Sequence, residues 1–299
     1  METSHVGAYA GEVPRPHLSP VWLVLTGIAS VQLGATISKG QFGEIPPSGM
    51  VLLRLATSSV ILLAIARPGL RGHSRADWRP VLTLGLALGA MNWAFYESFA
   101  RIPLGVAVTI EFIGPLTLAA VTGRRARDLV WVGLAAAGVV LLGLAPGAGV
   151  DALGFGLALF AGACWALYIL AAGATGRRWA GVDGLALAST IATLAVAPVA
   201  VASAGATLLE PRLLLLGAAV GVLSSVVPYS LEMIALRTMP PRVFGILMSL
   251  EPAAAALAAA LLLQEWLTPV QIVAVACVSA ASVGATRGSA ATEPAGEQP

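Results

Sequence analysis

Ten unbroken apolar stretches constrain what this chain can fold into. Each is close to the ~20 residues that an α-helix needs to cross the ~30 Å hydrocarbon core of a membrane. Their apolar residues are continuous rather than spaced with the period of a half-buried strand or helix, which argues against a soluble domain. The stretches cover residues 20–38, 49–66, 80–99, 103–122, 128–145, 153–173, 183–203, 212–232, 240–262 and 267–285. The sequence therefore predicts an all-α membrane protein with ten transmembrane helices.

Charged residues are too few for a water-facing surface. They make up 11% of the 299 residues, against about 25% in soluble domains. The net charge is +2, and the basic residues sit in short loops without interleaved aromatic residues, so no nucleic-acid partner is expected. Cys164 and Cys277 lie in separate apolar stretches without metal-ligand spacing. We interpret both as packing residues and predict neither a metal site nor a cofactor.

The placement of Lys and Arg predicts the orientation in the membrane. Of the 17 Lys and Arg residues, 13 fall in the termini and loops of one side, three fall on the other side, and Arg54 lies within a stretch. Positive residues gather on the cytoplasmic side, so both termini are expected there. Residues 1–19 and 287–299 are predicted to be disordered cytoplasmic ends. No cleaved signal peptide is recognised before the first stretch.

An internal repeat relates the two halves of the chain, residues 20–145 and 146–286. The segment ESFARIPLGVAVTIEFIGPL aligns with EMIALRTMPPRVFGILMSLEPA, and this places Glu97 on Glu232 and Pro115 on Pro252. Chance similarity of two Ala-, Leu- and Gly-rich sequences is the alternative, and the paired Glu and Pro residues argue against it. Because each half has five spans, the halves must be inverted relative to each other. Inverted repeats are typical of secondary transporters, with the substrate held near mid-membrane at their interface.

Four segments give the chain a family resemblance over about residues 20–285. LGVAVTIEFIGPLTLAA is similar to the fourth helix of the bacterial threonine/homoserine exporter branch of the drug/metabolite transporter superfamily. VLLRLATSSVILL, WALYIL and SLEPAAAALAAALLLQEWLTP resemble the same superfamily. The resemblance implies ten helices in two inverted five-helix repeats around a central cavity. It also implies export of small metabolites across the bacterial inner membrane, without fixing which metabolite.

Glu111 is the strongest candidate for a functional residue. It lies near the middle of its stretch, where a carboxylate costs about 2.5–3.5 kcal/mol to insert, so it should face the interior of the bundle. Pro115, four residues later, has no N–H for the carbonyl of Glu111. The functional interpretation is a partner for a substrate ammonium group or a proton carrier. The structural interpretation is a carboxyl neutralised by a buried Arg or by hydrogen bonds.

The end of the third stretch, MNWAFYESFAR, carries four more candidates. Asn92 and Tyr96 share one helix face, and Trp93 and Glu97 share the adjoining face. Together they would suit the wall of a substrate cavity. An interfacial aromatic belt is the alternative, and it would explain Trp93 and Tyr96 well but Asn92 and Glu97 poorly. Glu97 could also form a gate or a structural ion pair with Arg101 at the i, i+4 spacing.

The second half offers an inverted counterpart in SSVVPYSLEMIALR and SLEPA. Tyr229 is a candidate for substrate binding, and the carbonyl of Ser224 is expected to be freed by Pro228. Glu232 and Glu251 are candidates for proton transfer or gating, although Arg237 could neutralise Glu232 as plain structure. Bend points for alternating access are predicted at three prolines, namely Pro115, Pro228 and Pro252.

The remaining substrate-binding candidates are polar or aromatic residues of three other stretches. They are Gln32, Arg54, Trp165 and Tyr168. Arg54 could snorkel to the outer interface. Alternatively it is the counter-ion of a substrate carboxylate or of an inward-facing Glu. An intramembrane Glu and an intramembrane Arg would suit the two ends of a zwitterionic amino acid.

These features predict a secondary transporter in the lipid bilayer. We expect it to export small polar metabolites, and first of all amino acids such as threonine or homoserine, by alternating access, with proton coupling as one way to drive export. Other metabolites or drugs are the nearest alternative. An integral-membrane enzyme is a distant one, because the acidic residues are scattered and His5, His17 and His73 lie outside the stretches. A channel would need a polar ring or a filter loop, and neither is seen in the sequence. A phosphate-binding loop is not seen either, so transport driven by ATP bound to this chain is not expected.

Overall fold

The computed structural model describes residues 19–123, 126–144, 151–236 and 239–289. The described part of the chain is helical, with no strand in it. The predicted disordered ends lie outside the described residues over 1–18 and 290–299, but residues 287–289 continue the last helix, which corrects the start of the predicted C-terminal tail. The helices are α1 (Pro20–Gly40), α2 (Pro47–Ala66), α3 (Arg75–Phe99), α4 (Leu104–Glu111), α5 (Ile113–Gly123), α6 (Ala126–Leu144), α7 (Ala152–Gly176), α8 (Asp183–Ala204), α9 (Pro211–Gly221), α10 (Val227–Leu236), α11 (Pro241–Met248), α12 (Glu251–Leu263) and α13 (Pro269–Ser289), with a 3₁₀ turn η1 (Gly205–Leu209) and a π turn η2 (Val222–Val226).

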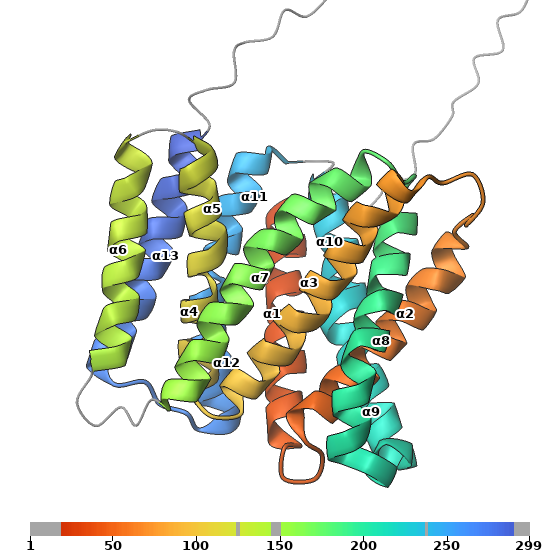
Figure 1. Ribbon diagram of the computed structural model, residues 1–299. Helices are drawn as coiled ribbons and strands as arrows, with labels where there is room; N and C mark the ends of the chain where they lie inside the picture. The colour runs from red at the N-terminus through yellow and green to blue at the C-terminus, as the bar shows by residue number, and fades with distance from the viewer. Residues whose placement is uncertain (1–18, 124–125, 145–150, 237–238, 290–299) are drawn as a thin grey trace, which may run out of the picture.

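Within the described residues these helices form ten columns, where a column is either one helix or several short helices that follow one another in line (Figure 1). Three of the columns are interrupted in this way. The interrupted columns are α4 with α5, α9 with η2 and α10, and α11 with α12. Eight columns in this part of the chain are long and apolar enough to cross a membrane. The other two are α3, whose first turns are charged, and α6, whose apolar part is short. The prediction of an all-α membrane protein is confirmed, and the ten columns lie where the ten stretches were placed.

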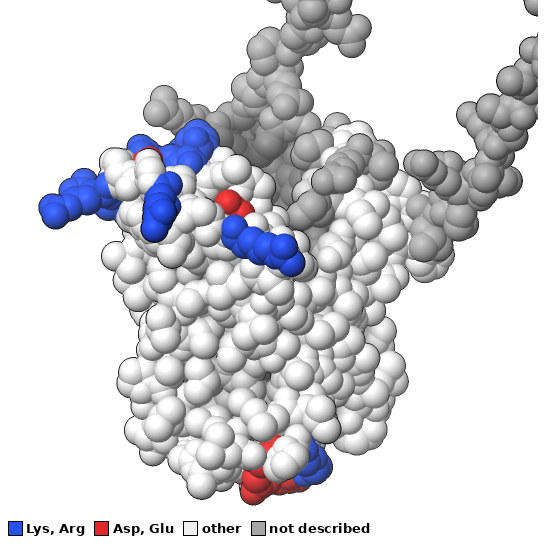
Figure 2. Space-filling view, turned by 90° about the vertical axis from the view of Figure 1, so that its right-hand side faces the viewer, with Lys and Arg blue, Asp and Glu red and all other residues white. Residues whose placement is uncertain are grey.

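The outer surface of the bundle is suited to lipid. Figure 2 shows charged side chains at the two ends of one face and an uncharged band between them. Large apolar side chains are exposed along the columns, among them Val60 (67%), Leu194 (67%) and Leu215 (73%). Such exposure would be unfavourable in water but is neutral against acyl chains. Helices satisfy their own backbone groups, which is what the hydrocarbon core demands.

Small residues set how closely the columns approach. A Cβ on Gly105 of α4 would lie 2.7 Å from the Cα atom of Ala256 in α12. A Cβ on Gly85 of α3 would lie 2.7 Å from the carbonyl oxygen of Ala188 in α8. Close backbone approach at small residues is how helices pack in lipid, where apolar burial gives little drive for association.

One end of the bundle is tied together by the loops before α3 and before α8. Ser74 and Asp77 form a capping box at the start of α3. Asp77 also accepts a hydrogen bond from Arg178 at 2.9 Å, and His73 stacks on Trp179 with 3.7 Å between ring centroids. Hydrogen bonds from the side chain and backbone of Ser74, together with the Arg178 guanidinium, lower the pKa of Asp77 to about 2. Asp77 precedes the apolar part of α3, so this contact lies at the end of the bundle.

Candidate functional site: a polar cavity among the helices

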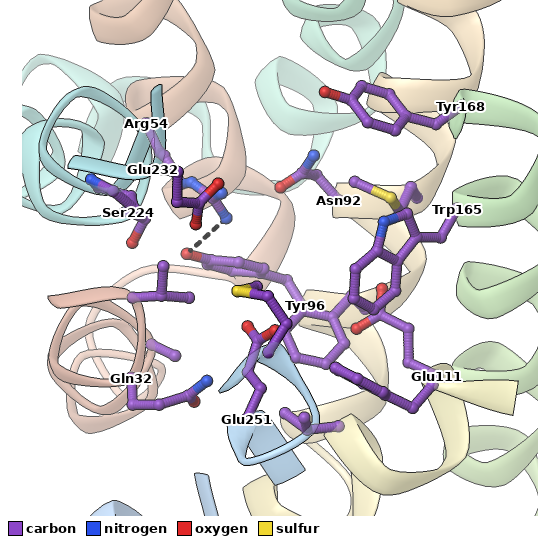
Figure 3. Close-up of a pocket in the computed structure, with 18 residues that line it drawn as sticks. Gln32, Arg54, Asn92, Tyr96, Glu111, Trp165, Tyr168, Ser224, Glu232 and Glu251 are labelled. Carbon is purple, nitrogen blue, oxygen red and sulfur yellow. Dashed lines mark hydrogen bonds between the residues drawn. The ribbon is translucent and has the colours of Figure 1, made fainter. Parts of the chain in front are cut away.

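A cavity of about 260 Å³ lies between the columns (Figure 3). Its wall comes from both halves of the chain. Its polar and aromatic lining residues are Gln32, Arg54, Asn92, Phe95, Tyr96, Glu111, Phe112, Trp165, Tyr168, Ser224, Glu232 and Glu251. Concave sites with a mostly apolar wall and a few converging polar groups are the usual form of small-molecule sites.

Glu111 reaches the cavity because its helix is interrupted. It is the last residue of α4, and α5 begins two residues later at Ile113. Pro115 cannot donate to the Glu111 carbonyl, which instead faces α7: a Cβ on Gly162 would lie 2.6 Å from that oxygen. Phe112 packs edge-on against Trp165 of α7 with 5.0 Å between ring centroids. The Glu111 side chain is 7% exposed and lines the cavity.

Arg54 turns inward rather than towards the membrane surface. Its Nη1 donates to the hydroxyl of Tyr96 at 3.3 Å, and its guanidinium carbon lies 5.5 Å from the Tyr96 ring centroid. Tyr96 is 1% exposed and is held by Phe42 and Phe99. The Nε of Arg54 has no hydrogen-bond partner among the described residues. The snorkelling alternative for Arg54 is therefore wrong, because the guanidinium lines the cavity.

Glu251 stands at a second interruption. The helix α11 ends at Met248, and α12 begins at Glu251, directly before Pro252. The hydroxyl of Ser249, in the gap, donates to the carbonyl of Gly245 at 2.9 Å and fixes the end of α11. The Oε2 atom of Glu251 is buried without a hydrogen-bond partner in the described structure. This carboxylate approaches the cavity from the side of α12, towards Tyr96 in Figure 3.

The third interruption corrects one expectation about Pro228. The turn η2 has π geometry, in which the N–H of Val227 donates to the carbonyl of Val222, five residues back. In this register Pro228 faces the carbonyl of Leu223, not that of Ser224. That carbonyl accepts a hydrogen bond from the hydroxyl of Ser30 in α1 at 2.6 Å. The freed backbone oxygen is thus used to join α1 to η2.

The structure brings most of the predicted site residues to one cavity. Those that line it are Gln32, Arg54, Asn92, Tyr96, Glu111, Trp165, Tyr168, Glu232 and Glu251, together with the predicted hinge residue Pro228. Pro115 and Pro252 lie at the two helix interruptions instead. The side chain of Tyr229 lies outside what the structure describes.

Trp93 and Glu97 are not among the lining residues, and the cavity-wall interpretation is corrected for both. They lie on the helix face beside that of Asn92 and Tyr96, about 100° around α3. Trp93 packs against the hydrophobic core. Glu97 forms the expected i, i+4 ion pair with Arg101 at 2.7 Å, and its role as a gate or as a structural pair stays a prediction.

Sequence reasoning missed the apolar part of the wall. Met91 and Phe95 flank Asn92 and Tyr96 on α3, while Met248 closes the side of α11. The i, i+4 spacing of Met91 and Phe95 beside a polar pair was a usable signal. Met248 carried none, since apolar residues dominate its segment.

Comparisons with known proteins agree with this architecture. The model of the EamA-like transporter family matches residues 152–287. The threonine/homoserine exporter RhtA of Escherichia coli (strain K12) is 44% identical over 273 residues, which cover 89% of this chain and 92% of that protein. The exporter of the same name from Salmonella typhimurium (strain LT2) is 44% identical over 276 residues with the same coverage. A solved crystal structure with 19% identity shares the fold at a TM-score of 0.60, over 92% of this chain and 100% of its own.

Identity at this level across nearly the whole length of both proteins is the mark of common descent. The chain belongs to the EamA-like transporter family of the drug/metabolite transporter superfamily, and it is a membrane transporter rather than an enzyme.

Proposed function

We propose that this chain exports threonine, homoserine and similar small amino acids from the cytoplasm across a bacterial inner membrane by alternating access. The observation that carries the proposal is a cavity between membrane-spanning columns that holds both the Arg54 guanidinium and the Glu111 carboxylate. The relatives that are 44% identical are threonine/homoserine exporters, which supports the same substrates.

The two charged groups fit the two ends of an amino acid. The Arg54 guanidinium carries five N–H donors, and the 3.3 Å bond to Tyr96 uses one of them. A substrate carboxylate would take two of the others as a bidentate pair. Glu111 would accept the ammonium group on the opposite wall, where Trp165 and Phe112 exclude water. Both contacts are made in a low-dielectric site, which strengthens them.

The cavity volume favours small cargo over drugs. Pockets for drug-sized ligands measure about 300–1,000 Å³, and this one measures about 260 Å³. An amino acid with a short side chain fits that space. A larger drug would require the aromatic wall to move apart.

The interrupted columns support two inverted halves around the cavity. The first half breaks after Glu111 and continues with Pro115, and the second half breaks before Glu251 and Pro252. Interrupted spans in corresponding positions of two halves mark the substrate site in inverted-repeat transporters. Residues 20–145 and 146–286 would rock against each other about these breaks.

A cluster of polar contacts would close the periplasmic end of the cavity. Lys39, at the end of α1, forms an ion pair with Glu265 at 2.5 Å and donates to the carbonyl of Ile102 at 2.9 Å. Glu265 also accepts from the N–H of Leu104 at the start of α4, at 2.9 Å. In Figure 1 this end of α1 lies opposite the loop between α2 and α3. With the Arg-rich loops in the cytoplasm, the Lys39–Glu265 contact lies on the periplasmic side and must open for release.

An excess of acidic groups supports exchange of substrate for protons. Glu111, Glu232 and Glu251 line the cavity with Arg54 as the one basic group among the described lining residues. Three carboxylates around one guanidinium in a low-dielectric site leave negative charge uncompensated. A substrate ammonium or a proton compensates it, and competition between the two would couple export to proton entry.

Efflux measurements with a substrate panel test this proposal. Cells that express the chain are loaded with labelled threonine, homoserine, lysine, glutamate or a lipophilic drug cation, and efflux is followed. Faster loss of threonine and homoserine than in cells expressing Arg54→Met is expected. If both amino acids leave the two kinds of cell at the same rate while the drug leaves faster from cells with the wild-type chain, the protein exports drugs instead. A second experiment, counterflow of labelled substrate, distinguishes a carrier from a channel, because only a carrier shows exchange that saturates.

A further inference from the structure

The hydroxyl of Tyr96 links the cavity to the end of α1. It accepts the hydrogen bond from Nη1 of Arg54 at 3.3 Å, which Figure 3 marks with a dashed line, and it lies 3.3 Å from Oγ of Ser38. Ser38 is 0% exposed and Tyr96 is 1% exposed, so both contacts are shielded from bulk water. The hydroxyl of Tyr96 therefore joins a group that would bind substrate to a residue in the last turn of α1.

The hydrogen atoms of this contact can be assigned from its neighbours. Oγ of Ser38 donates to the carbonyl of Gly34 at 2.8 Å. A serine hydroxyl has a single hydrogen and two lone pairs, so towards Tyr96 it is the acceptor. The phenol of Tyr96 accepts from Arg54 and donates its own single hydrogen to Ser38. One directed chain of hydrogen bonds thus runs from the guanidinium in the cavity to α1.

Ser38 directly precedes a residue of the proposed periplasmic gate. Lys39 forms the ion pair with Glu265 and donates to the carbonyl of Ile102 at 2.9 Å. These two contacts of Lys39 and the bond between Ser38 and Tyr96 all hold the end of α1. Of the partners in these three contacts, Tyr96 belongs to the cavity wall. The bond between Ser38 and Tyr96 is therefore placed to carry the state of the cavity to the gate.

We infer that binding of the substrate releases this bond and thereby loosens the gate, with Ser38 as a positioning residue for Tyr96. The inference rests on the proposed function, in which Arg54 binds the substrate carboxylate. A carboxylate at the guanidinium lies beside the Tyr96 hydroxyl, and it is a stronger acceptor than a neutral serine oxygen. Because the phenol has one hydrogen, a full hydrogen bond to the substrate replaces the one to Ser38. The end of α1 then keeps the contacts of Lys39.

The empty and the loaded protein thus differ by one contact at the gate. A ligand shifts a conformational equilibrium only by the difference between its contacts in the two states. One hydrogen bond corresponds to a shift of about two- to tenfold in the opening equilibrium. The direction suits an exporter, because a substrate that enters from the cytoplasm then favours opening towards the periplasm.

Removal of the Ser38 hydroxyl has an effect on binding that a purely structural residue would not have. In Ser38→Ala the hydrogen of Tyr96 has no competing acceptor on α1. The half-saturation concentration for threonine in counterflow, measured with the purified full chain in proteoliposomes, should therefore fall about two- to tenfold. Tyr96→Phe removes the donor itself and should raise that concentration. A residue that only stabilises the fold would leave the concentration unchanged or raise it.

The gate is followed by labelling of Leu104→Cys with a membrane-impermeant thiol reagent, in a background of Cys164→Ala and Cys277→Ala. Leu104 is 0% exposed, its N–H donates to Glu265 at 2.9 Å, and it lies outside the described lining of the cavity, where threonine itself would block labelling. We expect threonine to accelerate labelling in this background. With Ser38→Ala added, labelling without threonine should be about two- to tenfold faster, and threonine should accelerate it less.

Thr36→Val is the matched control. Thr36 is a buried residue of the same helix, and its hydroxyl donates to the carbonyl of Gln32 within α1 at 3.0 Å. Ser38→Ala likewise removes a bond within α1, the one to Gly34. Thr36→Val should therefore keep the half-saturation concentration and the labelling rate of the wild type, and a change equal to that of Ser38→Ala would overturn the inference.

The outcomes separate this inference from the proposed function. A wild type that transports threonine, with a Ser38→Ala variant that neither binds more tightly nor labels faster, overturns the inference alone. A wild type that does not transport threonine overturns both. Should Ser38→Ala not fold, Tyr96→Phe decides: faster labelling of Leu104→Cys without threonine supports the inference, and an unchanged rate overturns it.

Discussion

The backbone carbonyl of Glu111 faces Gly162 of α7 so closely that a Cβ on residue 162 would lie 2.6 Å from the oxygen. The carbonyl is free to do so because Pro115 offers it no hydrogen bond. Gly114 in turn lies against the carbonyl of Gly162, where a Cβ would also overlap. The two helices thus meet backbone to backbone at the level of the cavity carboxylate. The position of Glu111 depends on this crossing.

Gly162→Ala should therefore displace α7 from α4 and α5. The added methyl group meets backbone, which cannot move aside as a flexible side chain can, and overpacking of this kind costs about 1–3 kcal/mol. We expect a lower Tm in detergent and a loss of threonine efflux. Gly156→Ala, on the same helix with nothing within 4 Å of its Cβ, is the control and should behave as wild type. Wild-type efflux by Gly162→Ala would show that the crossing does not position the site.

Lys39→Ala should favour opening of the end of the cavity that we propose to face the periplasm. The ion pair with Glu265 is largely shielded, with side-chain exposures of 16% and 21%, and Lys39 also donates to the carbonyl of Ile102, so its loss frees the end of α1 from both segments. The readout is labelling of Ala35→Cys, in the cavity wall, by a membrane-impermeant thiol reagent after Cys164→Ala and Cys277→Ala. Labelling should accelerate in Lys39→Ala and return to the original rate in the charge exchange Lys39→Glu with Glu265→Lys.

The control for that experiment is Arg212→Ala. Arg212 pairs with Glu44 at the same end of the bundle, but the two side chains are 60% and 50% exposed. Exposed pairs contribute little, in the range of about 0–1 kcal/mol. Labelling that rises equally in Arg212→Ala would mean general loosening of that end rather than release of a gate.

Arg54→Lys tests whether geometry or charge matters at the carboxylate end. Lysine keeps the positive charge but loses the planar fork that binds a carboxylate with two hydrogen bonds. We expect the half-saturation concentration for threonine in counterflow to rise at least about tenfold, as for loss of a charge-assisted hydrogen bond. Tyr96→Phe keeps the guanidinium and removes the 3.3 Å bonds of the Tyr96 hydroxyl to Arg54 and to Ser38, so it should have a smaller effect. Equal affinity in Arg54→Lys would assign the carboxylate to another partner.

Asp77 gives a dependence of stability on pH. Because its pKa in the folded state is lowered to about 2, it stabilises the fold above its unfolded pKa of about 3.9, and this contribution is lost as the pH falls towards 2. The Tm difference between wild type and Asp77→Asn should be constant from pH 5 to 7 and shrink below about pH 4. Ser74→Ala removes the largest cause of the shift and should act in the same direction. A difference that grows on acidification would contradict the assignment.

Span positions were predictable from the sequence because the membrane imposes one physical requirement on every span. Each must be long, apolar and internally hydrogen-bonded. Glu111 could be singled out for the same reason, since a carboxylate at mid-membrane needs a protected place. The inward turn of Arg54 could not be derived, because it depends on where α3 places Tyr96.

The lining of the cavity depended on helix rotation and helix register, which could not be predicted from the sequence. Trp93 and Glu97 share a segment with Asn92 and Tyr96, and only the rotation of α3 decides which pair faces the cavity. Pro228 indicated that one backbone carbonyl lacks its helical hydrogen bond, but the π geometry shifts that carbonyl from Ser224 to Leu223. The contact between the hydroxyls of Ser38 and Tyr96 became visible only when the positions of α1 and α3 were known.

Efflux by Glu111→Gln tests the central claim most directly. The substitution keeps the shape of the side chain and removes its charge, so the packing against Gly162 is preserved. Truncating one partner of a buried charge contact costs about 2–5 kcal/mol, and we predict that threonine efflux falls at least about 30-fold at every pH. Glu210→Gln, an exposed carboxylate before α9, should export at the wild-type rate. Wild-type efflux by Glu111→Gln across the pH range would show that this carboxylate holds neither substrate nor proton.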